Sequence, residues 1–233
     1  MDRPCLILIP GLLNDADLWR EPAAMLSEVL DVRTADITRG SSLAELADQI
    51  LADAPERFSV AGFSLGGYVA QQIARQAPER LERLALVDTS IRPDSPQRAA
   101  ERLAQNEAVK ASSGHFHGFG DKLMRAYLAP GHAEDPAIAH RVREMTQRVG
   151  AEVFLRQNAL DRPDGAGVLS AFPGPVLIVC GAHDRITPVA WHEEMASLSP
   201  HAVLEIIPDA GHLTPIEAPV ALSMAMAHWM ARR

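Results

Sequence analysis

The chain has 233 residues, enough for one large hydrophobic core, and its 47% hydrophobic and 22% charged residues are typical of a globular protein. Its formal net charge of −8, without any basic stretch, argues against nucleic acid and against an anionic membrane surface as partners. Cys5 and Cys180 lie inside apolar runs, and neither a signal-peptide pattern nor a membrane-length apolar stretch is found, so we expect a cytoplasmic protein with reduced thiols.

Strands and helices alternate in the first part of the chain. Apolar runs predict four strands, at 6–9, 32–37, 58–63 and 84–87. Apolar residues at helical spacing predict helices at about 18–29, 43–51 and 65–77. Ser42 and Glu45 have the spacing of a capping box at the start of the second helix.

Residues 91–163 interrupt this alternation. Helical patterns, but no strand pattern, recur there at about 96–110, 121–129, 136–149 and 151–160. An insertion of roughly 70 residues is far longer than a connecting loop. We therefore predict that 91–163 form a helical cap, inserted into an α/β core made of 1–90 and 164–233.

The alternation resumes after the predicted cap. Strands are predicted at 176–180 and 203–207, and Glu205 suits an edge position for the second. Thr187 and Pro188 predict a helix start with threonine as the cap, and the last helix is expected over about 215–233. The whole pattern predicts an α/β fold: a mostly parallel sheet of about six strands, helices on both faces, and the cap inserted after the fourth strand.

A serine motif joins the third predicted strand to the helix after it. Gly62-x-Ser64-x-Gly66 leaves only Ser64 for the turn, which forces this residue into a strained conformation, expected with positive φ. The two glycines remove side chains that would collide where strand and helix run close together. This context is that of a nucleophile elbow. The alternative is that Ser64 serves only as the N-cap of the helix.

Further polar residues follow other predicted strands, and the carboxyl ends of parallel strands are where such sheets bind ligands. A serine nucleophile needs a base, and the base needs a third group that fixes its tautomer. His212, beside Gly211, is the predicted base, and Asp184 is the predicted orienting acid. Asp88 also follows a strand and is the alternative acid.

A reacting carbonyl would also need oxyanion donors and a binding pocket. The backbone N–H groups of Leu65, at the helix start, and of Leu12, in the loop after the first strand, are predicted as donors by their position. We predict a pocket with an apolar wall under the cap. Its predicted lining comprises Phe116, Phe119, Tyr127, Phe154, Ile186 and Leu213.

No cofactor is expected, because the sequence holds neither a phosphate-cradling glycine loop nor a dinucleotide fingerprint. His115 and His117 could be considered a metal pair, but a third ligand is not in view, so no metal site is predicted. The expected partner is a small-molecule substrate.

Three segments together resemble the α/β-hydrolase-fold serine hydrolases, and the resemblance covers nearly the whole chain. They are 61–67 (Ala-Gly-Phe-Ser-Leu-Gly-Gly), 181–188 (Gly-Ala-His-Asp-Arg-Ile-Thr-Pro) and 210–219 (Ala-Gly-His-Leu-Thr-Pro-Ile-Glu-Ala-Pro). The resemblance implies Ser64 as nucleophile, Asp184 as acid, His212 as base, and Leu12 and Leu65 as oxyanion donors. Two features depart from the family pattern: Pro10-Gly11 stands where His-Gly is common, and the first strand lacks the antiparallel hairpin that precedes it in many relatives.

The resemblance implies that a carboxylic ester or thioester of a small or medium-sized substrate is hydrolysed through an acyl-enzyme. C–C bond hydrolases, perhydrolases and lyases of the family share this residue pattern and remain alternatives, as does a receptor that binds a ligand without turnover. Because the predicted nucleophile is Ser and not Asp, haloalkane dehalogenases and epoxide hydrolases are excluded. The sequence predicts neither the acyl length nor the oligomeric state.

Overall fold

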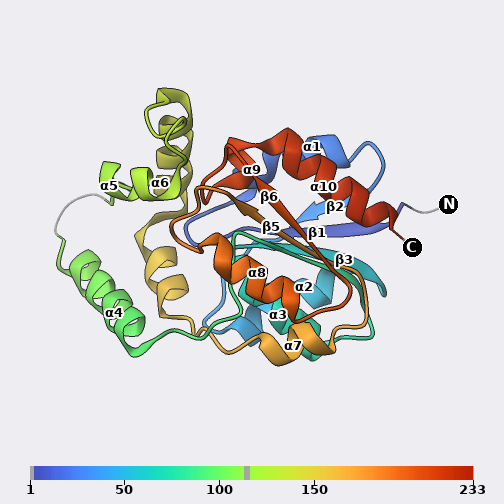
Figure 1. Cartoon of the computed structure of the whole chain (residues 1–233). Helices are drawn as coiled ribbons and strands as arrows, with labels where there is room; N and C mark the ends of the chain where they lie inside the picture. The colour runs from blue at the N-terminus through green and yellow to red at the C-terminus, as the bar shows by residue number, and fades with distance from the viewer. Residues whose placement is uncertain (1–2, 113–115, 233) are drawn as a thin grey trace.

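Six parallel strands form one sheet in the computed structural model, which describes residues 3–112 and 116–232 (Figure 1). They lie in the order β2-β1-β3-β4-β5-β6, and each neighbouring pair is parallel. Their bounds are β1 (Cys5–Ile9), β2 (Asp31–Thr34), β3 (Phe58–Phe63), β4 (Leu81–Val87), β5 (Val176–Gly181) and β6 (Ala202–Ile207). The predicted parallel sheet is confirmed, and the strand with Glu205 lies at an edge, as predicted.

Helices connect the strands. In the described residues they are η1 (Ala16–Trp19), α1 (Arg20–Leu26), α2 (Leu43–Asp53), α3 (Leu65–Gln76), α4 (Pro96–Ala111), α5 (Asp121–Tyr127), α6 (Pro136–Ala159), α7 (Ala166–Ala171), α8 (Val189–Ser197), α9 (Thr214–Glu217) and α10 (Pro219–Ala231). The sequence did not predict α7, a short helix after the cap segment. Within residues 3–112 and 116–232, none of the helices combines the length and the apolar character that crossing a membrane requires.

Two predicted elements end earlier or break. The second strand stops at Thr34, because the Asp36 carboxylate accepts the N–H of Thr38 at 2.8 Å and closes a turn there. The last helix divides into α9 and α10 at Ala218, whose backbone is not helical. Pro219 follows, and proline disfavours the helical conformation in the residue before it.

Two other local predictions are met in modified form. Ser42 Oγ accepts the N–H of Glu45 at 3.1 Å, but the Glu45 carboxylate returns to the N–H of Ser41 at 2.8 Å, one residue before the expected partner. The two predicted helices 136–149 and 151–160 form one element, α6, with a non-helical break at Gly150, where φ is 83°. A positive φ of this size suits glycine, which has no Cβ.

The side chains of β1 divide the core into two layers. Leu6 and Leu8 belong to one hydrophobic cluster, which includes Trp229 of α10. Ile7 and Ile9 belong to a second cluster, formed with residues of α2, α3, α7 and α8. Figure 1 shows the corresponding helices on opposite faces of the sheet, with α1, α9 and α10 on one side. Burial of both faces explains why the strand is continuously apolar instead of alternating.

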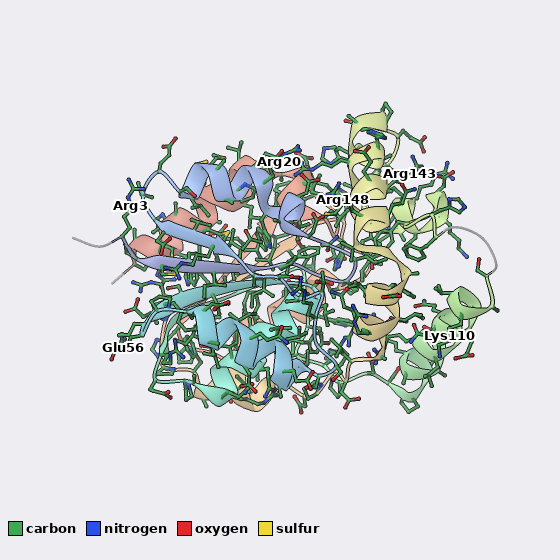
Figure 2. The ribbon with its side chains drawn as sticks, turned by 180° about the vertical axis from the view of Figure 1, so that it is seen from behind. Arg3, Arg20, Glu56, Lys110, Arg143 and Arg148 are labelled. Carbon is green, nitrogen blue, oxygen red and sulfur yellow. The ribbon has the colours of Figure 1, made fainter. Side chains whose placement is uncertain are left out.

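Helices α4, α5 and α6 stand at the carboxyl ends of the strands (Figure 1). Arginines connect α6 to the loop and helix after β1: Arg148 pairs with Asp15 at 2.9 Å, and Arg141 pairs with Glu21 at 2.8 Å. In Figure 2, Arg148 lies on the side of α6 that faces the core, and Arg143 lies on the opposite side. Because these pairs are partly exposed, they orient the helix more than they stabilise it.

Candidate active site

Ser64 forms the one-residue turn between β3 and α3. Its φ of 49° and ψ of −113° confirm the predicted strained conformation. A Cβ at position 62 would lie 2.3 Å from the carbonyl oxygen of Gly66, and a Cβ at Gly66 would lie 2.4 Å from that of Pro10, so both positions require glycine. Among the described residues, the Ser64 side chain has no capping hydrogen bond, and the interpretation of Ser64 as a helix cap alone is wrong.

A chain of hydrogen bonds runs from Ser64 to His212 and on to Asp184. Ser64 Oγ lies 3.1 Å from His212 Nε2, and His212 Nδ1 lies 2.8 Å from Asp184 Oδ2. The side chains of His212 and Asp184 are fully buried. The three residues come from the ends of β3, β5 and β6, so the parallel sheet brings them to one edge.

The Asp184 carboxylate is held ionised by donors that surround it. Its Oδ1 accepts the N–H groups of Ile186 and Thr187 at 2.8 and 2.9 Å, and its Oδ2 accepts the Thr187 hydroxyl at 2.6 Å. Burial opposes ionisation, yet His212 and the hydrogen bonds from His212 and Thr187 keep the pKa of Asp184 below its ordinary value. Thr187 is therefore not the predicted helix cap, because its hydroxyl is directed to the carboxylate.

Asp88, the alternative acid, occupies a different position. Its Oδ1 accepts the N–H of Gly181 at 3.0 Å, and the side chain is buried beside β5. Burial and then the nearby Asp184 carboxylate raise the pKa of Asp88 well above its ordinary value. The geometry thus joins the imidazole to Asp184, whereas Asp88 accepts a hydrogen bond from β5.

The imidazole is enclosed by aromatic rings and by the cap. The centroid of the Tyr127 ring lies 4.9 Å from that of His212, with the two rings perpendicular, and the Phe63 ring packs at 5.2 Å. The backbone N–H of His212 also donates to the carbonyl oxygen of Tyr127 at 2.6 Å. The last residue of α5 therefore fixes both the ring and the backbone of His212.

Glu217 connects the cap to the loop that carries His212 (residues 208–213, the histidine loop), a role that the sequence did not predict. Its Oε1 accepts the N–H groups of Gly211 and Leu213 at 2.9 and 3.0 Å, on either side of His212. Its Oε2 accepts the N–H of Ala129 at 2.7 Å and lies 3.0 Å from His132 Nδ1. The Glu217 side chain is fully buried, so the three backbone N–H groups depend on it as their acceptor.

We expect Glu217→Gln to lower the free energy of unfolding by about 1–3 kcal/mol, because an amide NH₂ would face N–H groups that need an acceptor. The histidine loop should also loosen, which should reduce turnover. Urea unfolding and ester hydrolysis measure the two effects. Glu205→Gln, on an exposed edge position, is the matched control. Equal stability of the two variants would contradict this role for Glu217.

A cap residue holds the loop after β1 (residues 10–15, the oxyanion loop), which carries the predicted oxyanion donor Leu12. Leu12 and Leu65 both line the cavity that contains Ser64. In the described residues, neither backbone N–H donates to an acceptor of the surrounding loops, which leaves both groups available. The next residue, Leu13, has a φ of 58°, and its N–H donates to Gln157 Oε1 at 2.9 Å. Gln157 is a buried residue of α6 that the sequence did not indicate.

The cavity at Ser64 has a volume of about 300 Å³ and is more polar than predicted. Of the predicted lining, Tyr127 and Ile186 contribute to it. The other predicted aromatic and aliphatic side chains pack the cap onto the core instead. Four of the predicted residues are outside the lining of this cavity and belong to or pack against one hydrophobic cluster: Phe116, Phe119, Phe154 and Leu213.

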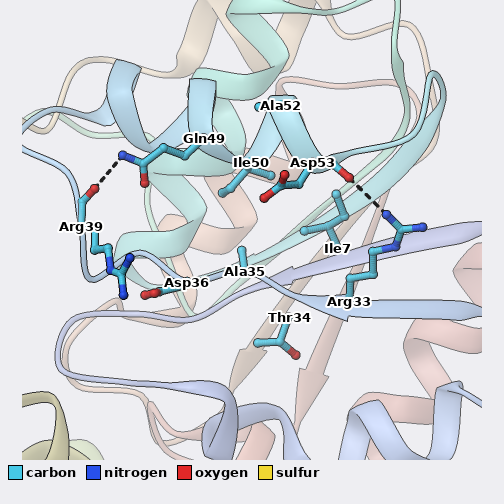
Figure 3. A pocket seen from close by; sticks show the side chains of 10 residues that line it. All are labelled: Ile7, Arg33, Thr34, Ala35, Asp36, Arg39, Gln49, Ile50, Ala52 and Asp53. Atoms are coloured by element: carbon cyan, nitrogen blue, oxygen red, sulfur yellow. Dashed lines mark hydrogen bonds between the residues drawn. The ribbon is translucent and has the colours of Figure 1, made fainter.

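Other candidate sites lie apart from Ser64. A cavity of about 660 Å³ lies beside β2 and α2, where Gln49 and Arg33 donate to carbonyl groups near its rim (Figure 3). His117 is exposed, and His115 lies outside the described residues. Within residues 3–112 and 116–232, no group of three or more potential metal ligands is found.

Comparisons with known proteins agree with this architecture. A model of the alpha/beta hydrolase family matches residues 6–225. A pimeloyl-(acyl-carrier protein) methyl ester esterase of Aromatoleum aromaticum is 28% identical, over 91% of this chain and 92% of its own. The 3-oxoadipate enol-lactonase 2 of Acinetobacter baylyi is 25% identical, over 99% of this chain and 90% of its own.

A solved structure is similar as well. A thermophilic esterase from Thermogutta terrifontis has a TM-score of 0.88 and 27% identity to this chain, with 98% of this chain and 90% of that one covered. Both the strand topology and the family match extend over almost the whole sequence. The protein belongs to the alpha/beta hydrolase family.

Proposed function

We propose that the protein is a serine hydrolase that cleaves a carboxylic ester or thioester of a small or medium-sized substrate through an acyl-enzyme. The observation that carries this proposal is the hydrogen-bonded chain of Ser64, His212 and Asp184 at distances of 3.1 and 2.8 Å. The similarity to an esterase and to an enol-lactonase supports a hydrolase acting on ester bonds.

In this proposal the Ser64 oxygen attacks the carbonyl carbon while His212 Nε2 takes the hydroxyl proton. Asp184 holds the other nitrogen of the ring and stabilises the imidazolium that forms. The N–H groups of Leu12 and Leu65 stabilise the oxyanion of the tetrahedral intermediate. The intermediate collapses when the alcohol or thiol leaves with the proton from His212. Water then attacks the acyl-enzyme by the same route, and the carboxylic acid is released.

The cap segment, residues 91–163, has a place in this proposal. It supplies Tyr127 beside the imidazole and Gln157 beside the oxyanion loop. Removal of water from such a site strengthens the interactions that stabilise developing charge. We therefore propose that the cap completes the site in addition to covering it.

A fluorophosphonate probe tests the proposal and distinguishes an enzyme from a receptor. We expect one label per chain, measured by intact mass, and none in Ser64→Ala, because only an activated hydroxyl reacts with such a probe. Ser90→Ala is the matched control: Ser90 lines the same cavity, and its hydroxyl accepts the N–H of Arg92.

Substrate panels then identify the bond that is cleaved. Turnover of p-nitrophenyl esters, with a burst that equals the labelled fraction, is expected for an acyl-enzyme. Labelling that persists in Ser64→Ala would contradict the assigned nucleophile. Labelling without turnover of any ester or thioester would instead favour the C–C bond or peroxide alternatives, whereas an unlabelled wild type would favour the receptor.

A further inference from the structure

The cavity above Ser64 contains an unusual excess of positive charge. Its lining includes four arginines, Arg92, Arg98, Arg102 and Arg162, but only two carboxylates, Asp94 and Glu101. The protein as a whole has a net charge of −8, so this wall differs in sign from the rest of the molecule. Positive charge that is concentrated in a cleft attracts anionic ligands.

Two of the four arginines have carboxylate partners. Arg102 pairs with Asp94, and the exposed Arg92 pairs with Glu194. Arg102 nevertheless keeps one buried donor, Nε, without a hydrogen-bond partner in the described part of the chain. A buried donor of a charged group that lacks a partner is costly. The pair with Asp94 therefore leaves part of the donor capacity of Arg102 unused.

The other two arginines lack such partners. Among residues 3–112 and 116–232, no carboxylate lies within 4.0 Å of the guanidinium of Arg162 or of Arg98. Arg162 is partly buried, donates to the carbonyl groups of Gln157 and Leu160, and lies 5.7 Å from the centre of the Tyr68 ring. Burial, and then repulsion from Arg102, lower the pKa of Arg162 to about 10, so it remains charged at neutral pH. Its charge is retained in the pocket at an energetic cost.

We propose that this arginine cluster, Arg98, Arg102 and Arg162, binds an anionic group of the substrate, a carboxylate or a phosphate. The planar guanidinium donates two parallel hydrogen bonds, a geometry that matches these oxyanions. The inference rests on the proposed function, because the anion is bound in the cavity that contains Ser64. It narrows the substrate class to small esters with a second, negatively charged group.

Matched esters test the inference with the anion on either side of the scissile bond. On the acyl side, monoethyl adipate carries a carboxylate and ethyl hexanoate lacks it. On the alcohol side, 3-carboxypropyl acetate carries a carboxylate and butyl acetate lacks it. We expect kcat/KM, measured by pH-stat titration, to be roughly ten- to hundredfold higher for the anionic ester than for the neutral ester of one pair. Replacing that carboxylate with a phosphonate then shows which oxyanion is preferred.

The advantage of the anionic ester should depend on the cluster. Arg162→Gln should remove most of it, mainly by raising KM for the anionic ester, and should change the kinetics with the neutral ester much less. Arg98→Gln, on an exposed position, should reduce the same advantage a few-fold and avoids any folding defect of the first variant. Arg143→Gln removes a cap arginine outside the cavity and should leave the ratio of kcat/KM between anionic and neutral ester unchanged in both pairs.

The outcomes separate this inference from the proposed function. If the neutral and the anionic ester of each pair are hydrolysed with equal kcat/KM, the proposed anion site is wrong and the proposed serine hydrolase is unaffected. An anionic preference that survives in both Arg162→Gln and Arg98→Gln would overturn the assignment to this cluster. If no ester of either kind is hydrolysed and the phosphonate probe fails to label Ser64, the proposed function itself fails.

Discussion

Ser64→Ala is expected to lower kcat for ester hydrolysis by on the order of a million-fold, and His212→Ala by nearly the same factor. The two losses should be similar because the serine is a poor nucleophile without the base, and the base has no proton to accept without the serine. The 3.1 Å separation of Ser64 Oγ and His212 Nε2 is the geometric reason for this coupling. The double variant should therefore be little worse than either single one.

Steady-state turnover of a p-nitrophenyl ester measures these losses. Each variant is purified on material never used for the wild type, so that traces of wild-type enzyme do not contribute. His183→Gln is the matched control, because His183 adjoins Asp184 in sequence but its side chain is exposed. We expect turnover of this variant to stay within a few-fold of wild type. Losses for Ser64→Ala and His212→Ala that multiply in the double variant would show that the two residues do not act as one unit.

Asp184→Asn is expected to lower turnover by about ten-thousand-fold while leaving the fold intact. An amide at this position would turn a donor toward His212 Nδ1, so the ring would adopt the tautomer that cannot accept the serine proton. The hydrogen bonds that Asp184 accepts from Ile186 and Thr187 would keep the side chain in place. The defect should therefore appear in kcat and not in the unfolding midpoint.

Asp88→Asn is the comparison that separates the two acids. The amide can still accept the N–H of Gly181 through its oxygen, so turnover should change little. Because folding raises the pKa of Asp88, the stability that this group contributes should be lost as the pH rises above about 3.9, its unfolded pKa. The free energy of unfolding of Asp88→Asn, relative to that of the wild type, should therefore be higher at pH 8 than at pH 4. A larger loss of turnover in Asp88→Asn than in Asp184→Asn would reverse the assignment.

Much of the architecture is predictable from local sequence. The parallel sheet follows from apolar runs that alternate with helical patterns, since strands buried on both faces are apolar throughout. The strained turn at Ser64 follows from Gly62 and Gly66, because only glycine permits so close an approach of strand and helix. The positions of Asp184 and His212 after strands place them at the same edge. In each case a few neighbouring residues carry the information.

The tertiary structure alone decided which polar groups support the site. Glu217 lies five residues after His212 but accepts the N–H of Ala129 in the cap, and Gln157 reaches the oxyanion loop from α6. These contacts join segments far apart in sequence, and neither residue has a distinctive local pattern. The same limit applies to the predicted pocket. Aromatic residues can face a core or a ligand, only their packing distinguishes the two, and Phe119 and Phe154 lie in a hydrophobic cluster.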